Sequence, residues 1–173
     1  QLTSLDVSQN TALTQLWCDF NQLTSLNVSG ATALTILVCG YNQLTSFDVS
    51  QNTALTGLWC YWNYLTSLDV SNNTYLTELY CTDNNLTSLD VRNGNNTNIT
   101  DFWADNNPNL FCIDVDDPVW STINWTTSNG NIDPQTSFST NCNPVGCTDS
   151  LACNYNPLAT IDDGSCGYNT ASF

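Results

Sequence analysis

Leu2-Thr3-Ser4-Leu5-Asp6-Val7 opens a 21-residue unit that begins again at Leu23, Leu44, Leu65 and Leu86 with unchanged spacing. A second half-unit, Leu-Thr-x-Leu-x-Cys-x-x-Asn, lies inside each repeat and begins at Leu13, Leu34, Leu55 and Leu76. A strict period of this length is typical of solenoids, in which each coil packs only against its neighbours. We therefore predict a β solenoid with short parallel strands on two sides.

The loss of the period divides the chain into three predicted parts. Residues 1–107 form the solenoid, residues 108–142 a C-terminal cap, and residues 143–173 a small separate module. Apolar residues of the second part predict a lid over the open end of the solenoid, namely Leu110, Phe111, Ile113, Trp120, Ile123, Trp125 and Phe138. We expect a disulfide between Cys112 and Cys142 to hold this lid, which stabilises it by about 3 to 4 kcal/mol.

The cysteines fall into two groups. Cys18, Cys39, Cys60 and Cys81 are 21 residues apart and in phase with the inward leucines, so they predict a ladder of buried, structural thiols. Cysteines of the irregular C-terminal part are typical of disulfides and therefore of a secreted or cell-surface protein. A row of asparagines at the bends predicts a second internal ladder that satisfies backbone groups: Asn21, Asn42, Asn63 and Asn84.

Charge excludes several classes of function. Sixteen acidic residues face one basic residue, Arg92, and the chain has no His. Nucleic acids and anionic membranes attract basic patches, so neither is an expected partner. The sequence contains no run of 18 apolar residues, so we expect no insertion into a membrane. Without His or Lys to carry protons or activate nucleophiles, we expect no enzyme activity and no organic cofactor.

Aromatic residues predict an exposed recognition face on the Leu-x-x-Leu-x-Cys side. The period-2 rule places one row outward on the strands, with a second row just past them. The first row contains Trp17, Val38, Trp59, Tyr80 and Trp103, and the second contains Phe20, Tyr41 and Trp62. Cross-strand stacking alone also favours aromatic residues here, whereas a large exposed apolar patch usually marks a contact site for a protein or a glycan.

Other repeated polar residues lie on the opposite side and at the corners. A serine row stands beside an acidic row (Asp6, Asn27, Asp48, Asp69 and Asp90), which predicts a solvated face or a site for cations. Two rows of threonine are predicted at the corners, where stiff β-branched residues suit turns. A repetitive threonine face also leaves ice binding as a minor alternative. The rows are Thr3, Thr24, Thr45, Thr66, Thr87, and Thr14, Thr35, Thr56, Thr77, Thr100.

Calcium is the one cofactor that the sequence suggests. Hard cations such as calcium bind oxygen ligands. Side chains with such oxygens are concentrated in the last module, near Gly164: Asp149, Asn154, Asn156, Asp162 and Asp163. A knot held by disulfides alone is the alternative.

The alternating motifs resemble the 21-residue leucine-rich repeat class of secreted bacterial proteins, particularly from Bacteroidetes. This resemblance implies a right-handed solenoid with few or no helices. Residues 107–142 are similar to the cap of those proteins. Gly146-Cys147-Thr148-Asp149 through Asp163-Gly164-Ser165-Cys166 resembles a short extracellular module, which implies a Cys147–Cys166 disulfide and leaves Cys153 unpaired or bonded outside the chain.

Together these patterns predict a non-enzymatic extracellular module for recognition or adhesion, binding a protein or a glycan through its aromatic face. The alternative is a structural subunit that stacks end to end through the first coil, because Leu2, Leu5 and Val7 lack a polar cap.

Overall fold

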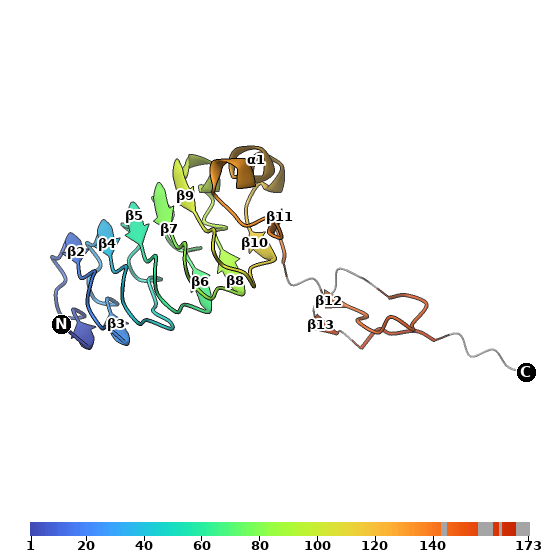
Figure 1. Ribbon diagram of the computed structural model, residues 1–173, viewed down its shortest axis with the longest axis horizontal. Helices are drawn as coiled ribbons and strands as arrows, with labels where there is room; N and C mark the ends of the chain where they lie inside the picture. Colours follow the sequence, from blue (N-terminus) through green and yellow to red (C-terminus); the bar gives the residue numbers. More distant parts are fainter. Residues whose placement is uncertain (143–144, 156–160, 163, 169–173) are drawn as a thin grey trace, which may run out of the picture. The chain divides into compact units, whose positions relative to one another are not determined.

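The structure is a computed structural model that describes residues 1–142, 145–155, 161–162 and 164–168 (Figure 1). The chain divides into two compact units, residues 1–140 and residues 141–173. Residues 108–140 therefore share one unit with the repeats.

The first side of the solenoid is a five-stranded parallel sheet. Its strands are β2 (Gln15–Trp17), β4 (Ile36–Val38), β5 (Gly57–Trp59), β7 (Glu78–Tyr80) and β9 (Asp101–Trp103), which lie side by side along the upper edge in Figure 1. Leu16, Leu37, Leu58 and Leu79 are successive partners in register, and Leu79 pairs with Phe102. This arrangement confirms the predicted β solenoid of leucine-rich repeats. The last step is longer by two residues, and the 3-10 turn η1 (Asn96–Asn98) lies there.

The second side contains the Leu-Thr-Ser-Leu-Asp-Val strands, in two separate groups. β1 (Ser4–Asp6) pairs with β3 (Ser25–Asn27), whereas β6 (Ser67–Asp69), β8 (Ser88–Asp90), β10 (Cys112–Asp114) and β11 (Ser137–Ser139) form a four-stranded sheet. The equivalent residues 46–48 of the third coil are not in a strand. Phe47 stands here in place of leucine and is half-buried against the core.

The core between the two sides is a column of leucine, valine and cysteine side chains. Cys39, Cys60 and Cys81 are completely buried and Cys18 nearly so, all four as free thiols. Burial is the main reason that the pKa of Cys18 is raised to about 11 and that of Cys81 to about 12. These cysteines therefore stay protonated and pack as small apolar residues.

Asparagines join adjacent coils at the bend after each cysteine. The Oδ1 atom of Asn42 accepts a hydrogen bond from the backbone of Leu23 (2.9 Å), and its Nδ2 atom donates to the carbonyls of Cys18 and Cys39 (3.0 Å each). Asn63, Asn84 and Asn107 repeat this pattern, and Asn21 has the first-coil version of it at a half-buried position. Each amide thus satisfies backbone groups that would otherwise be buried without partners.

The cap covers the end of the solenoid core. Trp125 is buried and stacks on Phe102 with ring centroids 3.9 Å apart, while Phe138 and Trp120 pack at the edge. Two residues differ from the predicted lid: Ile123 lies on the outer face of α1 (Pro118–Asn124) and is 70% exposed, and Phe111 is 62% exposed. Helix α1 begins at Pro118, and the side chain of Asp117 accepts a hydrogen bond from the backbone of Trp120.

The second unit contains a short parallel pair, β12 (Val145–Gly146) and β13 (Ile161–Asp162). Cys147 and Cys166 are joined by a disulfide. Cys112 and Cys142 are also disulfide-bonded. Cys153 is a free thiol whose Sγ atom lies 3.0 Å from the carbonyl oxygen of Gly167.

Candidate recognition surface

The aromatic rings of the strand row contact one another along the sheet, and the one aliphatic member of the row, Val38, lies beneath them. Trp17 is 60% exposed, whereas Trp59, Tyr80 and Trp103 are half-buried and Val38 is only 1% exposed. Trp17 and Trp59 meet edge to face above Val38, with centroids 5.9 Å apart. Trp59 and Tyr80 lie 5.4 Å apart, and Tyr80 and Trp103 lie 6.5 Å apart. The Trp59–Tyr80 and Tyr80–Trp103 separations exceed the spacing of adjacent strands because aromatic rings favour edge or offset contacts over direct superposition. Trp17 and Trp59 lie two strands apart, so their rings lean toward each other over the smaller Val38.

The second row, just past the strands, consists of Phe20, Tyr41 and Trp62. Their rings are stacked, with centroid separations of 4.4 Å and 5.6 Å, and all three side chains are exposed. Asp83 and Asn106 hold the equivalent positions in the following coils.

Every residue of this second row has a left-handed backbone conformation, with φ between 50° and 53°. Asn and Asp tolerate this conformation, as at Asp83 and Asn106, but an aromatic residue with positive φ is rare. Strain of this kind costs about 1 to 3 kcal/mol for each residue and is concentrated at functional sites. The backbone conformation at this position is therefore unfavourable for the aromatic residues that the first three coils have there.

An apolar hollow of about 370 Å³ opens between the strand row and the residues that follow it. Its walls are Trp59, Tyr61, Tyr80 and Thr82. The ring of Tyr61 lies where a side chain on Gly40 would clash, so the glycine makes room for it. Burial first, and then the charge of Asp19, raises the pKa of Tyr61. Sequence reasoning missed Tyr61, although the small residue at Gly40 was a usable signal.

Carboxylates surround this hollow without basic residues to balance them. Trp59 donates from Nε1 to Glu78 Oε2 at 3.1 Å. The pKa of Tyr80 is raised by burial and then by the charges of Asp101 and Glu78. Arg92, the one basic residue of the chain, is bound to Asp90 on the opposite side.

The acidic row on that opposite side has a structural role. Asp6 Oδ1 accepts a hydrogen bond from the backbone of Ser8 at 2.8 Å, and Asp48, Asp69 and Asp90 make the same contact two residues ahead. These contacts stabilise the turn after each strand. At six corners the threonine hydroxyl donates to a carbonyl of the preceding coil, as Thr35 does to Thr14 (2.9 Å).

The predicted calcium ligands are only partly within the described residues. Asp149 accepts hydrogen bonds from Tyr168 and from the backbone of Leu151, and Asn154 bonds to Ser165 and Gly167. Asn156, Asp163 and the side chain of Asp162 lie outside the description. Within the described residues, no group of three or more His, Cys, Asp or Glu side chains is placed to hold a metal.

In the described part of the chain, no helix has the length and apolar character needed to cross a membrane. No protein-family model and no curated protein matches the sequence. Among solved structures, the functional domain of InlJ from Listeria monocytogenes, which includes a cysteine ladder, is similar to this chain with 31% identity and a TM-score of 0.56. The similarity covers 84% of this chain but 34% of that one, so this chain spans about a third of its length.

Proposed function

We propose that this protein is a non-enzymatic extracellular recognition module that binds a protein partner through the aromatic side of its solenoid. The observation that carries the proposal is the row of Phe20, Tyr41 and Trp62, which is exposed and stacked on a left-handed backbone. Packing does not require these rings, because Asp83 and Asn106 hold the same position in later coils. Rigid exposed aromatic residues are the usual anchors of protein interfaces.

The charge around the aromatic rows favours a partner with basic groups. Glu78 and Asp101 lie beside Tyr80, and Asp19 lies close enough to Tyr61 to influence its titration. A Lys or Arg side chain placed against these rings gains both a cation–π contact and the attraction of the carboxylates. The disulfide-bonded cysteines support an oxidising, extracellular setting for this encounter.

A triple substitution tests the proposal without disturbing the core. Phe20→Asn, Tyr41→Asn and Trp62→Asn place at each position the residue that the chain itself has at Asn106. Lost ring stacking of about 0.5 to 1.5 kcal/mol per pair is offset by relief of about 1 to 3 kcal/mol of backbone strain per residue. We therefore expect the urea midpoint of the triple variant to stay unchanged or to rise.

Binding is measured on a panel of immobilised extracellular proteins of known charge, with a glycan array in parallel. We expect the wild type to bind basic proteins and the triple variant to lose about tenfold or more in affinity. The control, Tyr75→Asn with Phe111→Asn, removes exposed rings outside both rows and should bind as the wild type does. Equal binding by the folded triple variant would refute the proposal.

A further inference from the structure

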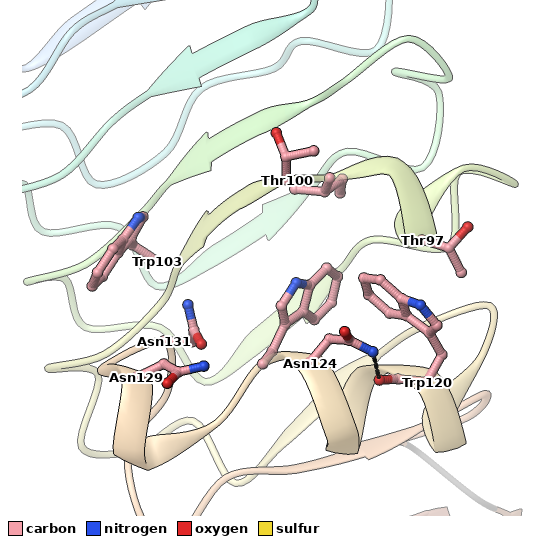
Figure 2. A pocket seen from close by; sticks show the side chains of 9 residues that line it. Thr97, Thr100, Trp103, Trp120, Asn124, Asn129 and Asn131 are labelled. Atoms are coloured by element: carbon pink, nitrogen blue, oxygen red, sulfur yellow. Dashed lines mark hydrogen bonds between the residues drawn. The ribbon is translucent and has the colours of Figure 1, made fainter.

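A second pocket, at the cap end of the solenoid, differs from the aromatic hollow in its chemistry. It has a volume of about 360 Å³, within the range of about 300 to 1,000 Å³ that is usual for small-molecule sites. In Figure 2, Trp103 and Trp120 lie at its two ends, with Asn124, Asn129 and Asn131 between them. The remaining lining residues are Thr97, Ile99, Thr100 and Trp125. None of these side chains carries a charge, although the net charge of the chain is −15.

Three elements position this pocket. Strand β9 ends at Trp103, helix α1 carries Trp120 and Asn124 one turn apart, and the 3-10 turn η2 (Thr127–Asn129) carries Asn129. Gly130 follows with φ of 78°, and a Cβ atom there would lie 3.4 Å from the ring of Trp103. Trp125 is held against Phe102 and forms an apolar part of the wall.

The amides of the pocket divide into structural and available groups. Asn131 has a structural role, because its Oδ1 atom accepts from the backbone of Thr126 and its Nδ2 atom donates to the carbonyl of Phe102. Asn124 donates from Nδ2 to the carbonyl of Trp120 at 2.8 Å, which leaves its oxygen as an acceptor. The exposed side chains of Asn129 and Thr97 add donors and acceptors that face solvent.

This combination fits a neutral sugar. A pyranose ring has an apolar C–H face that packs against an indole ring, and a rim of hydroxyl groups that both donate and accept hydrogen bonds. Neutral amides and hydroxyls meet that rim in both senses, whereas a carboxylate only accepts. A cationic ligand has stronger attraction at the carboxylates of the aromatic hollow, and an anion is repelled by the net charge.

We propose that the pocket between Trp103 and Trp120 binds an uncharged sugar residue of a glycan, stacked on an indole ring and hydrogen-bonded to Asn124 and Asn129. The site shares Trp103 with the strand row, but its other side chains come from the last coil and the cap, and it takes a different class of ligand. It therefore goes beyond the proposed function.

Titration with neutral monosaccharides tests the site, using glucose, galactose, mannose and N-acetylglucosamine at millimolar concentrations. The readouts are the indole N–H signals in NMR spectra and the heat of binding, and glucuronic acid and glucosamine are the charged comparisons. We expect at least one neutral sugar to bind and to shift the signals of Trp103 and Trp120, and glucuronic acid to bind more weakly because the net charge of the chain is negative. Glucosamine should act mainly at the aromatic hollow, where it shifts the signal of Trp59 beside Glu78. Failure of every neutral sugar to bind the folded full chain would overturn the proposal.

Substitutions locate the binding. Trp120→Leu should weaken it about tenfold or more, and Asn129→Ala by about threefold to tenfold. Ser128→Ala, next to Asn129 but outside the lining, is the matched control and should leave affinity within about twofold. Circular dichroism shows whether Trp120→Leu is folded, and Asn129→Ala provides a test that does not touch the core.

The Phe20→Asn, Tyr41→Asn, Trp62→Asn variant separates this inference from the proposed function. It should bind the sugar as the wild type does, even where it has lost the protein partner. Loss of sugar binding in this variant would place the sugar on the aromatic rows and refute the cap site. Sugar binding that persists alongside unchanged protein binding would support the cap site and refute the proposed protein surface.

Discussion

Asn63 illustrates how one side chain holds neighbouring coils together. Its Oδ1 atom accepts from the backbone of Leu44 at 3.0 Å, and its Nδ2 atom donates to the carbonyls of Cys39 and Cys60 at 3.1 Å each. Asn63 is 5% exposed, so water has little access to these groups. Asn21 makes similar contacts in the first coil but is half exposed.

Asn63→Ala should therefore cost much more than Asn21→Ala. The buried substitution leaves at least one N–H and one carbonyl group without partners, which costs about 1 to 3 kcal/mol for each group. We expect a loss of about 3 kcal/mol at Asn63 and of about 1 kcal/mol or less at Asn21, where water replaces the amide. Urea denaturation of both variants measures the difference, and equal losses would contradict the buried ladder.

At the scale of elements, the two sides of the solenoid differ in continuity. The first side pairs five strands without interruption, whereas the second is divided between β3 and β6. Val7 and Val70 donate backbone hydrogen bonds to the next coil, to Asn27 and Asp90 at 2.9 Å each. The division coincides with Phe47, which replaces the leucine of this side in the third of the five repeats.

Phe47→Leu should join the two groups of strands. We expect that a leucine, as at Leu26 and Leu68 in the neighbouring strands, allows residues 46–48 to pair on both sides. We expect slower amide hydrogen exchange at Val28 and Val49, approaching that of Val70, and a gain of about 1 kcal/mol for each hydrogen bond formed. Unchanged exchange at both amides would show that the ring of Phe47 is not the cause of the division.

At the scale of the whole molecule, the two compact units rest on different sources of stability. Residues 1–140 have a long apolar core, whereas the described residues of the second unit include few buried apolar side chains and a Cys147–Cys166 disulfide. Small units without a large core usually depend on disulfides or a metal. Calcium binding within residues 143–173 stays a prediction from the sequence.

Calcium and a chelator together test that prediction on the full chain. If calcium binds the folded second unit, added calcium raises the melting temperature of its transition and the chelator reverses the rise, because a ligand of the native state stabilises it. NMR signals of Asp149 and Asn154 report whether the change occurs in this unit. Identical melting temperatures and identical spectra with calcium and with chelator would contradict calcium binding. The disulfide would then be what stabilises the unit.

Much of the fold was predictable because contacts in a solenoid repeat with the sequence. The positions of Cys39, Cys60 and Asn63 follow from their spacing, since residues 21 apart lie in register on adjacent strands. The burial of Val38 was not predictable in this way. It depends on how the rings of Trp17 and Trp59 meet above it, and the period carries no information on ring orientation.

The sequence by itself determined the coil, the two sides, the inward cysteine column and the outward aromatic rows, because each depends only on contacts between successive repeats. The tertiary structure alone decided the left-handed backbone under Phe20, Tyr41 and Trp62, the hollow beside Tyr61 and the uncharged pocket at the cap. The physical reason is that these features arise from turn conformations and from the packing of an aperiodic segment, residues 108–140, against the last coil.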